Sequence, residues 1–316
     1  MFSVIISLYF MLNNNTKIKV GIIRGGEGNF YSSSLKKGGD IILHIHDNLQ
    51  DTHKVFDILI DKKGIWYFNG MPIKPSDLRY KIDIVWNTSK HPRVSSILDD
   101  LSITKIDNGS FQNMLENSNT MLQKHIKNID VKMPRFLVLP VYQKDIDGPL
   151  NKYVIKKAKE VFEKFSSPWI VKSFTPDSNM GIHLAKTFPE LVDAIEDGII
   201  HQKSILIEEF ILGRVFSVHS VTGFRNQDIY VFPPKDFLAE EKEKIIKLVK
   251  DIHKHIDAKH YLKSDFILHA KKGFFLTNIE LFPDLREGSH LEQSCKYVGA
   301  DIHHISMHIL EKALNK

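Results

Sequence analysis

Residues 261–283 read YLKSDFILHAKKGFFLTNIELFP, and this stretch decides the fold. Two runs rich in β-branched and aromatic residues flank Lys271-Lys272-Gly273, which predicts a β-hairpin. Asn278 and Glu280 are two residues apart on the second strand, so their side chains share one face. Pairing across the short turn places Asp265 roughly opposite them. Two carboxylates and an amide oxygen at one end of a hairpin suit Mg²⁺, although the spacing alone equally allows ordinary solvent-facing side chains.

Outward from this hairpin, strand-like and helix-like segments alternate along the chain, which predicts an α/β protein. We expect an N-terminal parallel α/β domain at residues 17–115. Its expected elements are a strand at 17–23, a short helix after Gly28, a hairpin over 55–70, and strands at 82–87 and 103–107.

The rest of the chain predicts two α+β units, at residues 116–212 and 213–316. The first opens on an amphipathic stretch at 110–128 and carries strands at 135–140, 169–173 and 204–210 and helices at 152–165 and 189–200. The second carries strands at 214–221 and 228–234, a long helix at 239–256, the hairpin, and two closing helices.

The composition is that of an ordinary globular protein, with 42% hydrophobic and 26% charged residues among 316. The net charge of +5 is mild, and the lysines are interleaved with acids, so no nucleic-acid partner is expected. An anionic small molecule fits this charge. The single cysteine, Cys295, excludes an internal disulfide and predicts a reducing cytoplasm; we interpret it as a packed thiol. The 16 histidines show no zinc-ligand spacing.

The first twelve residues, MFSVIISLYFML, are almost wholly apolar. The run has no basic start, is too short to span a bilayer, and leads into NNNT rather than a cleavage site. We therefore expect translation to begin at Met11 and residues 1–16 to be a non-native or disordered extension, with no membrane partner.

A lysine ends the apolar strand PWIVKS at residues 168–173, before the turn-rich FTPDSNMG. Lys172 could reach a phosphate that the following loop covers, although a lysine at a strand end is more often solvated. The segment ILIEEFILGR at 205–214 joins two units and places acids and backbone groups where ligands often bind. By itself it is equally a simple connection.

Taken in order, these segments resemble the D-alanine–D-alanine ligase family of ATP-grasp enzymes. IVKSFTPDSNMGI resembles the family's phosphate-lysine strand and mobile loop, and ILIEEFILGR resembles its adenine hinge. LKSDF and LTNIELFPDLREGSHLE resemble its arginine-x-aspartate strand and its glutamate-x-asparagine and serine-leucine segment. The resemblance runs from about Lys17 to the C-terminus. It implies an ATP-grasp fold in which an N-terminal α/β domain precedes two α+β subdomains that clasp ATP.

The resemblance implies an ATP-dependent ligase that makes an acylphosphate and then an amide, as in peptidoglycan precursor synthesis. ATP and Mg²⁺ (or Mn²⁺) are the implied cofactors, a small amino acid or carboxylate the substrate, and a homodimer the assembly. The implied nucleotide-binding residues are Lys124, Lys172, Glu208, Phe210 and Ile211. The implied metal ligands are Asp265, Asn278 and Glu280, and the implied catalytic residues are Lys263 at the oxyanion, Ser178 in the mobile loop and Ser289 at the acceptor carboxylate.

The sequence departs from the family pattern on the substrate side. Val215 stands where the family has a ribose-binding acid, Lys263 where it has arginine, and Asp284 where it has glycine. The histidine-glycine loop of the first domain is replaced by NTSKHPRVSS, and the chain between Val221 and Pro233 is too short for the usual closing loop. Three functions stay open: a D-alanine ligase, a carboxylate–amine ligase with another substrate, and a non-catalytic nucleotide-binding relic.

Overall fold

The computed structural model describes residues 17–28, 30–174 and 179–315. The chain forms two compact units. Unit 1 extends to Ser118 and includes His219–Lys263 and everything from Glu280 onward, whereas unit 2 holds Asn119–Val218 and Ser264–Ile279. The three consecutive domains expected from the sequence stay a prediction. The extension at residues 1–16 and the start at Met11 lie outside the described residues.

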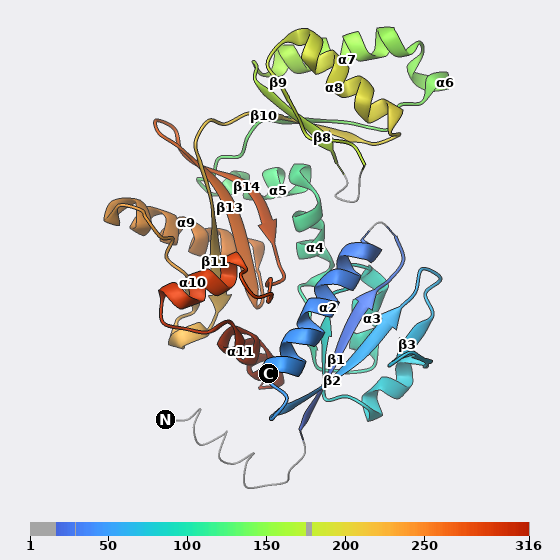
Figure 1. Ribbon diagram of the computed structural model, residues 1–316, viewed down its shortest axis with the longest axis vertical. Helices are drawn as coiled ribbons and strands as arrows, with labels where there is room; N and C mark the ends of the chain where they lie inside the picture. The colour runs from blue at the N-terminus through green and yellow to red at the C-terminus, as the bar shows by residue number, and fades with distance from the viewer. Residues whose placement is uncertain (1–16, 29, 175–178, 316) are drawn as a thin grey trace. The chain divides into compact units, whose positions relative to one another are not determined.

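The first sheet of unit 1 is mainly parallel, as predicted (Figure 1). Its strands β2, β1, β5 and β6 run parallel, and β3 and β4 extend it as an antiparallel hairpin. In the order β4-β3-β2-β1-β5-β6, the strand bounds are Met71–Pro72, Trp66–Phe68, His53–Ile60, Ile18–Gly25, Ile84–Asn87 and Lys105–Ile106. The sheet is flanked by α2 (Tyr31–Asn48), η1 (Pro75–Tyr80), α3 (Pro92–Asp100) and α4 (Gly109–Asn117).

Helix α2 corrects one expectation, because the helix after Gly28 has 18 residues rather than a short span. The pair Gly38-Gly39 weakens the helical signal in the sequence. In the fold, Gly38 lies against β1, and a Cβ atom there would come within 2.6 Å of the Cβ of Arg24. Close packing of helix on strand, rather than helix propensity, therefore explains this glycine.

Unit 2 is built around an antiparallel sheet in the order β7-β10-β8-β9. The strand bounds in that order are Phe136–Leu139, Ile205–Glu209, Trp169–Ser173 and His183–Ala185. Helices α7 (Leu150–Lys164) and α8 (Phe188–Ile200) cover one face and enclose a core that includes Val161, Trp169 and Ile195 (Figure 1). Shorter helices complete it: α5 (Asn119–His125), η2 (Ile126–Asn128) and α6 (Lys144–Asp147).

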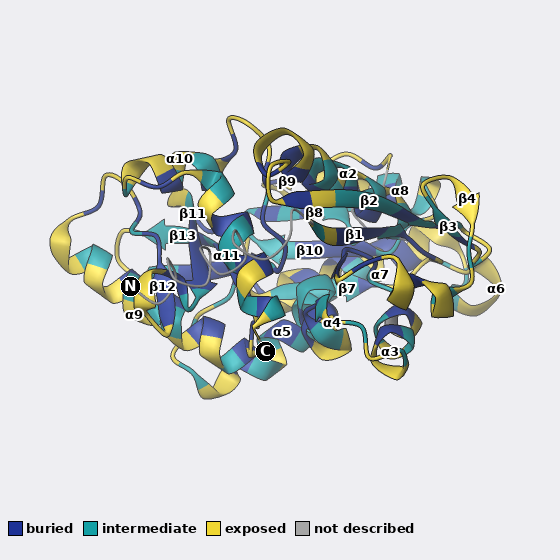
Figure 2. Cartoon of the chain, turned by 90° about the horizontal axis from the view of Figure 1, so that it is seen from below, coloured by how far each residue is buried: buried dark blue, intermediate teal, exposed yellow. Residues whose placement is uncertain are grey.

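A third sheet has the order β12-β11-β13-β14, with bounds Ile229–Val231, Arg214–Thr222, Tyr261–His269 and Gly273–Glu280. The hairpin predicted at 261–283 is present as β13 and β14, which are neighbours in this sheet. The remaining helices are η3 (Phe224–Asn226), α9 (Ala239–Ile256), α10 (His290–Tyr297) and α11 (Ile302–Leu314). Helix α9 has the predicted bounds, and its buried residues, Ile245, Val249, Ile252 and Ile256 among them, recur at helical spacing. Figure 2 shows strand interiors buried and outward helix faces exposed.

Candidate active site

Lys172 and Glu208 lie side by side on neighbouring strands of unit 2. Lys172 on β8 is opposite Leu206 on β10, so Glu208, two residues further along, projects from the same face. The Lys172 Nζ is 2.5 Å from Glu208 Oε2, and Asn119 Nδ2 donates to Glu208 Oε1 at 3.2 Å. The carboxylate of Glu208 is thus fixed at the sheet surface by two donors, with lone pairs left to accept from a ligand.

The segment after β10 is anchored on both sides. Ile211 is buried, and the backbone N–H of Phe210 donates to Pro168 O at 3.1 Å. The guanidinium of Arg135 binds Glu209 in bidentate fashion, at 2.8 and 3.0 Å, and this hydrogen bonding lowers the pKa of Glu209. The Arg135–Glu209 pair was not predicted. It holds the strand end that carries Glu208 and Phe210.

Two predicted nucleotide residues are less constrained by the structure. Lys124 is an exposed residue in the last turn of α5. Ser178 lies outside the described residues. Their roles stay predictions.

Asp265 and Asn278 meet across the hairpin in unit 2. Asn278 Nδ2 donates to Asp265 Oδ2 at 3.2 Å, and Ser217 Oγ donates to Asp265 Oδ1 at 2.5 Å. The contact joins the amide nitrogen to the carboxylate; the carboxylate oxygens and the amide oxygen of Asn278 are hard ligands of the kind that Mg²⁺ prefers. The pairing of these two residues, which the sequence only suggested, is present.

Glu280, the third expected metal ligand, belongs to unit 1, where lysines hold it. Lys263 Nζ donates to Glu280 Oε1 at 2.9 Å, and Lys37 Nζ is 3.8 Å from Glu280 Oε2. The predicted oxyanion-stabilising lysine and the predicted metal ligand are therefore ion-paired. The positive charge on Lys263 is kept near the end of the hairpin.

Lys37 also contacts Glu116, which forms a buried ion pair with Lys90 that was not predicted from the sequence. Lys90 Nζ is 3.0 Å from Glu116 Oε2, and Lys37 Nζ is 3.6 Å from Glu116 Oε1. The Lys90 and Glu116 side chains are only 9% and 4% exposed, and desolvation lowers the pKa of Lys90. Lys90 also donates to Asn117 Oδ1 at 2.7 Å. Lys90 lies in NTSKHPRVSS, the segment that stands where the family has its histidine-glycine loop. This departure from the family pattern was the one feature of the sequence that could have drawn attention to Lys90.

Ser289 is the N-cap of α10, and its Oγ accepts from the Glu292 N–H at 3.2 Å. This leaves the hydroxyl proton of Ser289 available for donation. The acid at position 284 is neutralised locally, because Arg286 binds Asp284 in bidentate fashion at 2.8 and 2.6 Å. This hydrogen bonding lowers the pKa of Asp284, so the carboxylate stays ionised but paired.

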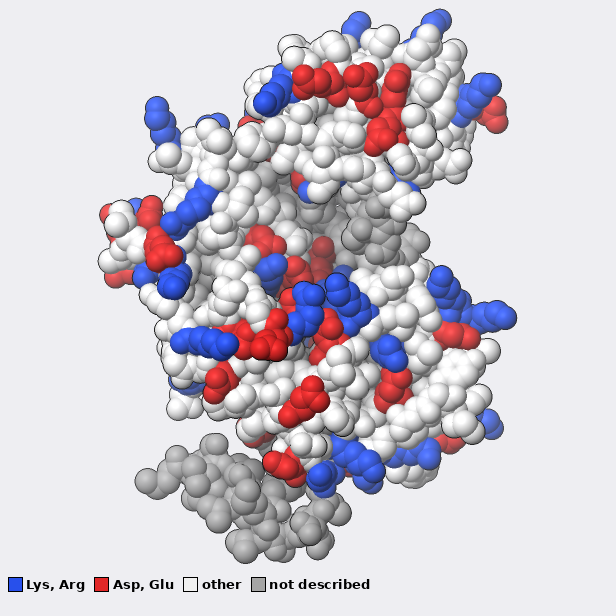
Figure 3. All heavy atoms as spheres, in the orientation of Figure 1, with Lys and Arg blue, Asp and Glu red and all other residues white. Residues whose placement is uncertain are grey.

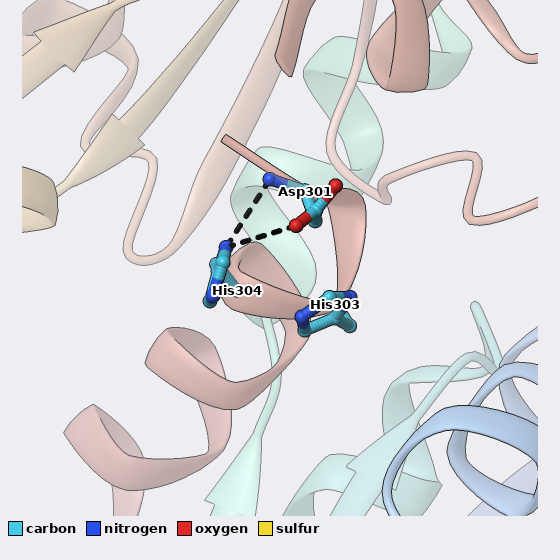
Figure 4. A group of neighbouring side chains, drawn as sticks. All are labelled: Asp301, His303 and His304. Carbon is cyan, nitrogen blue, oxygen red and sulfur yellow. Dashed lines mark hydrogen bonds and ion pairs between the residues drawn. The ribbon is translucent and has the colours of Figure 1, made fainter. Parts of the chain in front are cut away.

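Figure 4 shows Asp301, His303 and His304 close together at the start of α11. The Asp301 N–H donates to His304 Nδ1 at 3.1 Å, and Asp301 with His304 forms a capping box. Capping of the N-terminus of α11 thus accounts for the contact between Asp301 and His304.

Cys295 is a fully buried residue of α10, and burial raises the pKa of its thiol to about 12, which agrees with a packed thiol.

Comparisons with known proteins point to a single family. The family model described as D-ala D-ala ligase C-terminus matches residues 126–240. A D-alanine–D-alanine ligase of Christiangramia forsetii is 22% identical over 341 residues, which cover 95% of this chain and 99% of that protein. The chain is thus similar to D-alanine–D-alanine ligases along nearly its whole length, at an identity that fits a divergent relative.

Solved structures of family members share the ATP-grasp fold with this chain. D-alanyl-alanine synthetase A from Vibrio cholerae has a TM-score of 0.75 at 16% identity, covering 96% of this chain and all (100%) of that one. The D-alanine–D-alanine ligase from Bacillus anthracis, complexed with ATP, has a TM-score of 0.67 at 16% identity, covering 95% and 98%. The predicted α/β, ATP-grasp fold is confirmed.

The structure also places the departures from the family pattern. Val215, where the family has an acid, is 73% exposed near the start of β11.

On the visible face, Lys and Arg side chains are interspersed with Asp and Glu rather than gathered in a basic stripe (Figure 3). Among the described residues, no helix is long and apolar enough to cross a membrane.

Proposed function

We propose that the chain is an ATP- and Mg²⁺-dependent carboxylate–amine ligase, with D-alanine as both donor and acceptor. The observation that supports the proposal is the Lys172–Glu208 pair, whose two side chains project from one face of the unit 2 sheet. ATP phosphorylates the donor carboxylate, and the acceptor amine then attacks the acylphosphate. The product is a D-alanyl dipeptide.

Different residues bind the adenine and the phosphates of ATP. Glu208 accepts from the adenine amino group, with Phe210 and Ile211 supplying backbone and packing contacts. Lys172 and Lys124 offset phosphate charge, and Lys172 exchanges its contact with Glu208 for the phosphates. Ser178 belongs to the loop that covers them.

Asp265 and Asn278 fit Mg²⁺ because their side chains meet through the Asn278 Nδ2–Asp265 Oδ2 hydrogen bond and both carry oxygen ligands, and Glu280 follows Asn278 by two residues. Asn278 would hold the ion through its amide oxygen, which a flip of the amide group would present without a change in the backbone. Mg²⁺ or Mn²⁺ at this position offsets the negative charge of the phosphates. Glu280 would be a third ligand of the ion, and the ammonium of Lys263, which pairs with Glu280, would then be available to a substrate.

Two residues of unit 1 act on the substrates. Lys263 stabilises the oxyanion that develops at the acyl carbon, as a point charge rather than the planar fork of an arginine. Ser289 donates its hydroxyl proton to the acceptor carboxylate while its oxygen caps α10. We also propose a cytoplasmic location, which the single, free and buried cysteine supports, and a homodimer, which the family resemblance implies.

The test is phosphate release from Mg²⁺-ATP by the protein started at Met11, with and without D-alanine, followed by mass spectrometry of the product. Release that rises with D-alanine, together with dipeptide, supports the proposal. Release that rises only with another amine or acid identifies a ligase of changed specificity. ATP binding without turnover for any substrate leaves the non-catalytic relic.

A further inference from the structure

Two histidines and a tyrosine form a hydrogen-bonded row in unit 1. His219 on β11 is 2% exposed and its Nδ1 is 2.7 Å from the Tyr261 hydroxyl. Its other ring nitrogen, Nε2, is 2.7 Å from Nδ1 of His290. Tyr261 is also buried, whereas His290 is an exposed residue. The row therefore runs from the core to the surface.

The exposed end of this row is at the proposed substrate side. His290 follows Ser289 directly at the start of α10. Burial holds the pKa of His219 well below its usual range. His290 and Lys263 lower this pKa further, and Asp284 raises it. His219 is consequently neutral and has a single ring proton.

A neutral His219 has its one ring proton either on Nδ1 or on Nε2, which gives two possible directions for the hydrogen bonds along the row. In one of them, His290 Nδ1–H donates to His219 Nε2, and His219 Nδ1–H donates to the Tyr261 oxygen. This arrangement gives Nε2 of His290 a lone pair. A proton gained there makes an imidazolium whose Nδ1–H is already bound by an acceptor, as in catalytic histidines oriented by a third group.

We propose that His290 is the proton acceptor for the attacking amine and that His219, held by Tyr261, is its positioning residue. The proposal rests on the proposed ligase function and adds a residue to it. The acceptor ammonium gives one proton to His290 Nε2, and the freed lone pair attacks the acyl carbon. The carbon–oxygen bond to phosphate breaks, its electron pair leaves with the phosphate, and the second nitrogen-bound proton leaves on that phosphate. One amide proton remains, so protons and charge balance.

The test compares the wild-type protein with His290→Gln, using His46→Gln as the matched control because His46 is an exposed histidine paired with Asp47. The rate of dipeptide formation is measured against pH. We expect wild-type kcat to fall as pH falls through the pKa of His290. In His290→Gln this fall of kcat at low pH (the acidic limb of the profile) disappears. Its kcat at neutral pH is lower by about 10²–10⁴-fold, the usual contribution of a positioned base.

A second acceptor isolates the proton transfer. Hydroxylamine is unprotonated at neutral pH, so it needs no base to attack the acylphosphate and yields a hydroxamate. We expect His290→Gln to form hydroxamate near the wild-type rate while dipeptide formation is lost. If His290→Gln keeps the wild-type pH profile, or loses rate equally with D-alanine and with hydroxylamine, the role of His290 is overturned. A wild type that makes no amide with any acceptor overturns the ligase function as well, so the two failures are distinct.

His219→Leu tests the positioning role. Removing the acceptor of His290 Nδ1–H destabilises the imidazolium, so the kcat limb moves to lower pH. His219→Gln, whose amide oxygen can accept the same hydrogen bond, should restore part of the shift. If neither substitution moves the limb in folded protein, the row has only a packing role and the proposal fails.

Discussion

Removal of Lys90 is expected to destabilise unit 1, because it leaves the carboxylate of Glu116 buried without its nearest cation. The Glu116 side chain is 4% exposed, so solvent cannot take the place of the 3.0 Å ion pair. Breaking a buried pair by removing one partner costs about 3–5 kcal/mol. Lys37 remains 3.6 Å from Glu116 and offsets part of the charge. We therefore expect Lys90→Met to lower the free energy of unfolding by about 3 kcal/mol, the lower end of that range.

The assay is equilibrium denaturant unfolding of Lys90→Met, Glu116→Leu and the double variant, followed by circular dichroism. The double variant removes both charges and should return close to wild-type stability, because apolar replacement of a whole buried pair is often neutral. The magnitude of the pair's coupling energy then approaches the sum of the losses seen in the two single variants. A single variant as stable as wild type, or a double variant whose loss equals the sum of the two, would refute this reasoning.

Three further predictions concern the nucleotide half and pH. Lys172→Ala should weaken ATP binding in a thermal-shift titration, whereas Lys164→Ala, at the end of α7, should not; equal affinities would contradict a phosphate role for Lys172. Asp265→Ala should abolish the Mg²⁺ dependence of ATP affinity without unfolding the chain, and unchanged dependence would exclude it as a ligand. Burial lowers the pKa of His253 from 6.5 to about 4, so the unfolded chain binds a proton that the folded chain does not; the free energy of unfolding should fall by about 3 kcal/mol as pH falls from 6.5 to 4. His253→Gln should flatten this slope, measured by unfolding at each pH, and an unchanged slope would contradict it.

The elements of the fold were largely predictable because their signals are local. The bounds of α9 follow from apolar residues at helical spacing, and the hairpin at 261–283 from two β-rich runs around a short turn. The length of α2 was not predictable, since Gly38 weakens a helix in isolation and only its contact with β1 explains it. The stretch at 110–128 looked continuous, but the extended backbone of Ser118 separates α4 from α5.

By itself, the sequence determined the order of the motifs and, through them, the ATP-grasp fold and the residue types available to hold ATP and a metal. Strand periodicity was enough to place Asn278 and Glu280 on one face, because that relation depends on covalent geometry alone. Tertiary structure decided which charges meet: Lys172 with Glu208, Lys263 with Glu280, and Lys90 with Glu116. The Lys90–Glu116 pair joins residues from separate elements of unit 1, and its strength comes from exclusion of water, a property that exists only once the chain has folded.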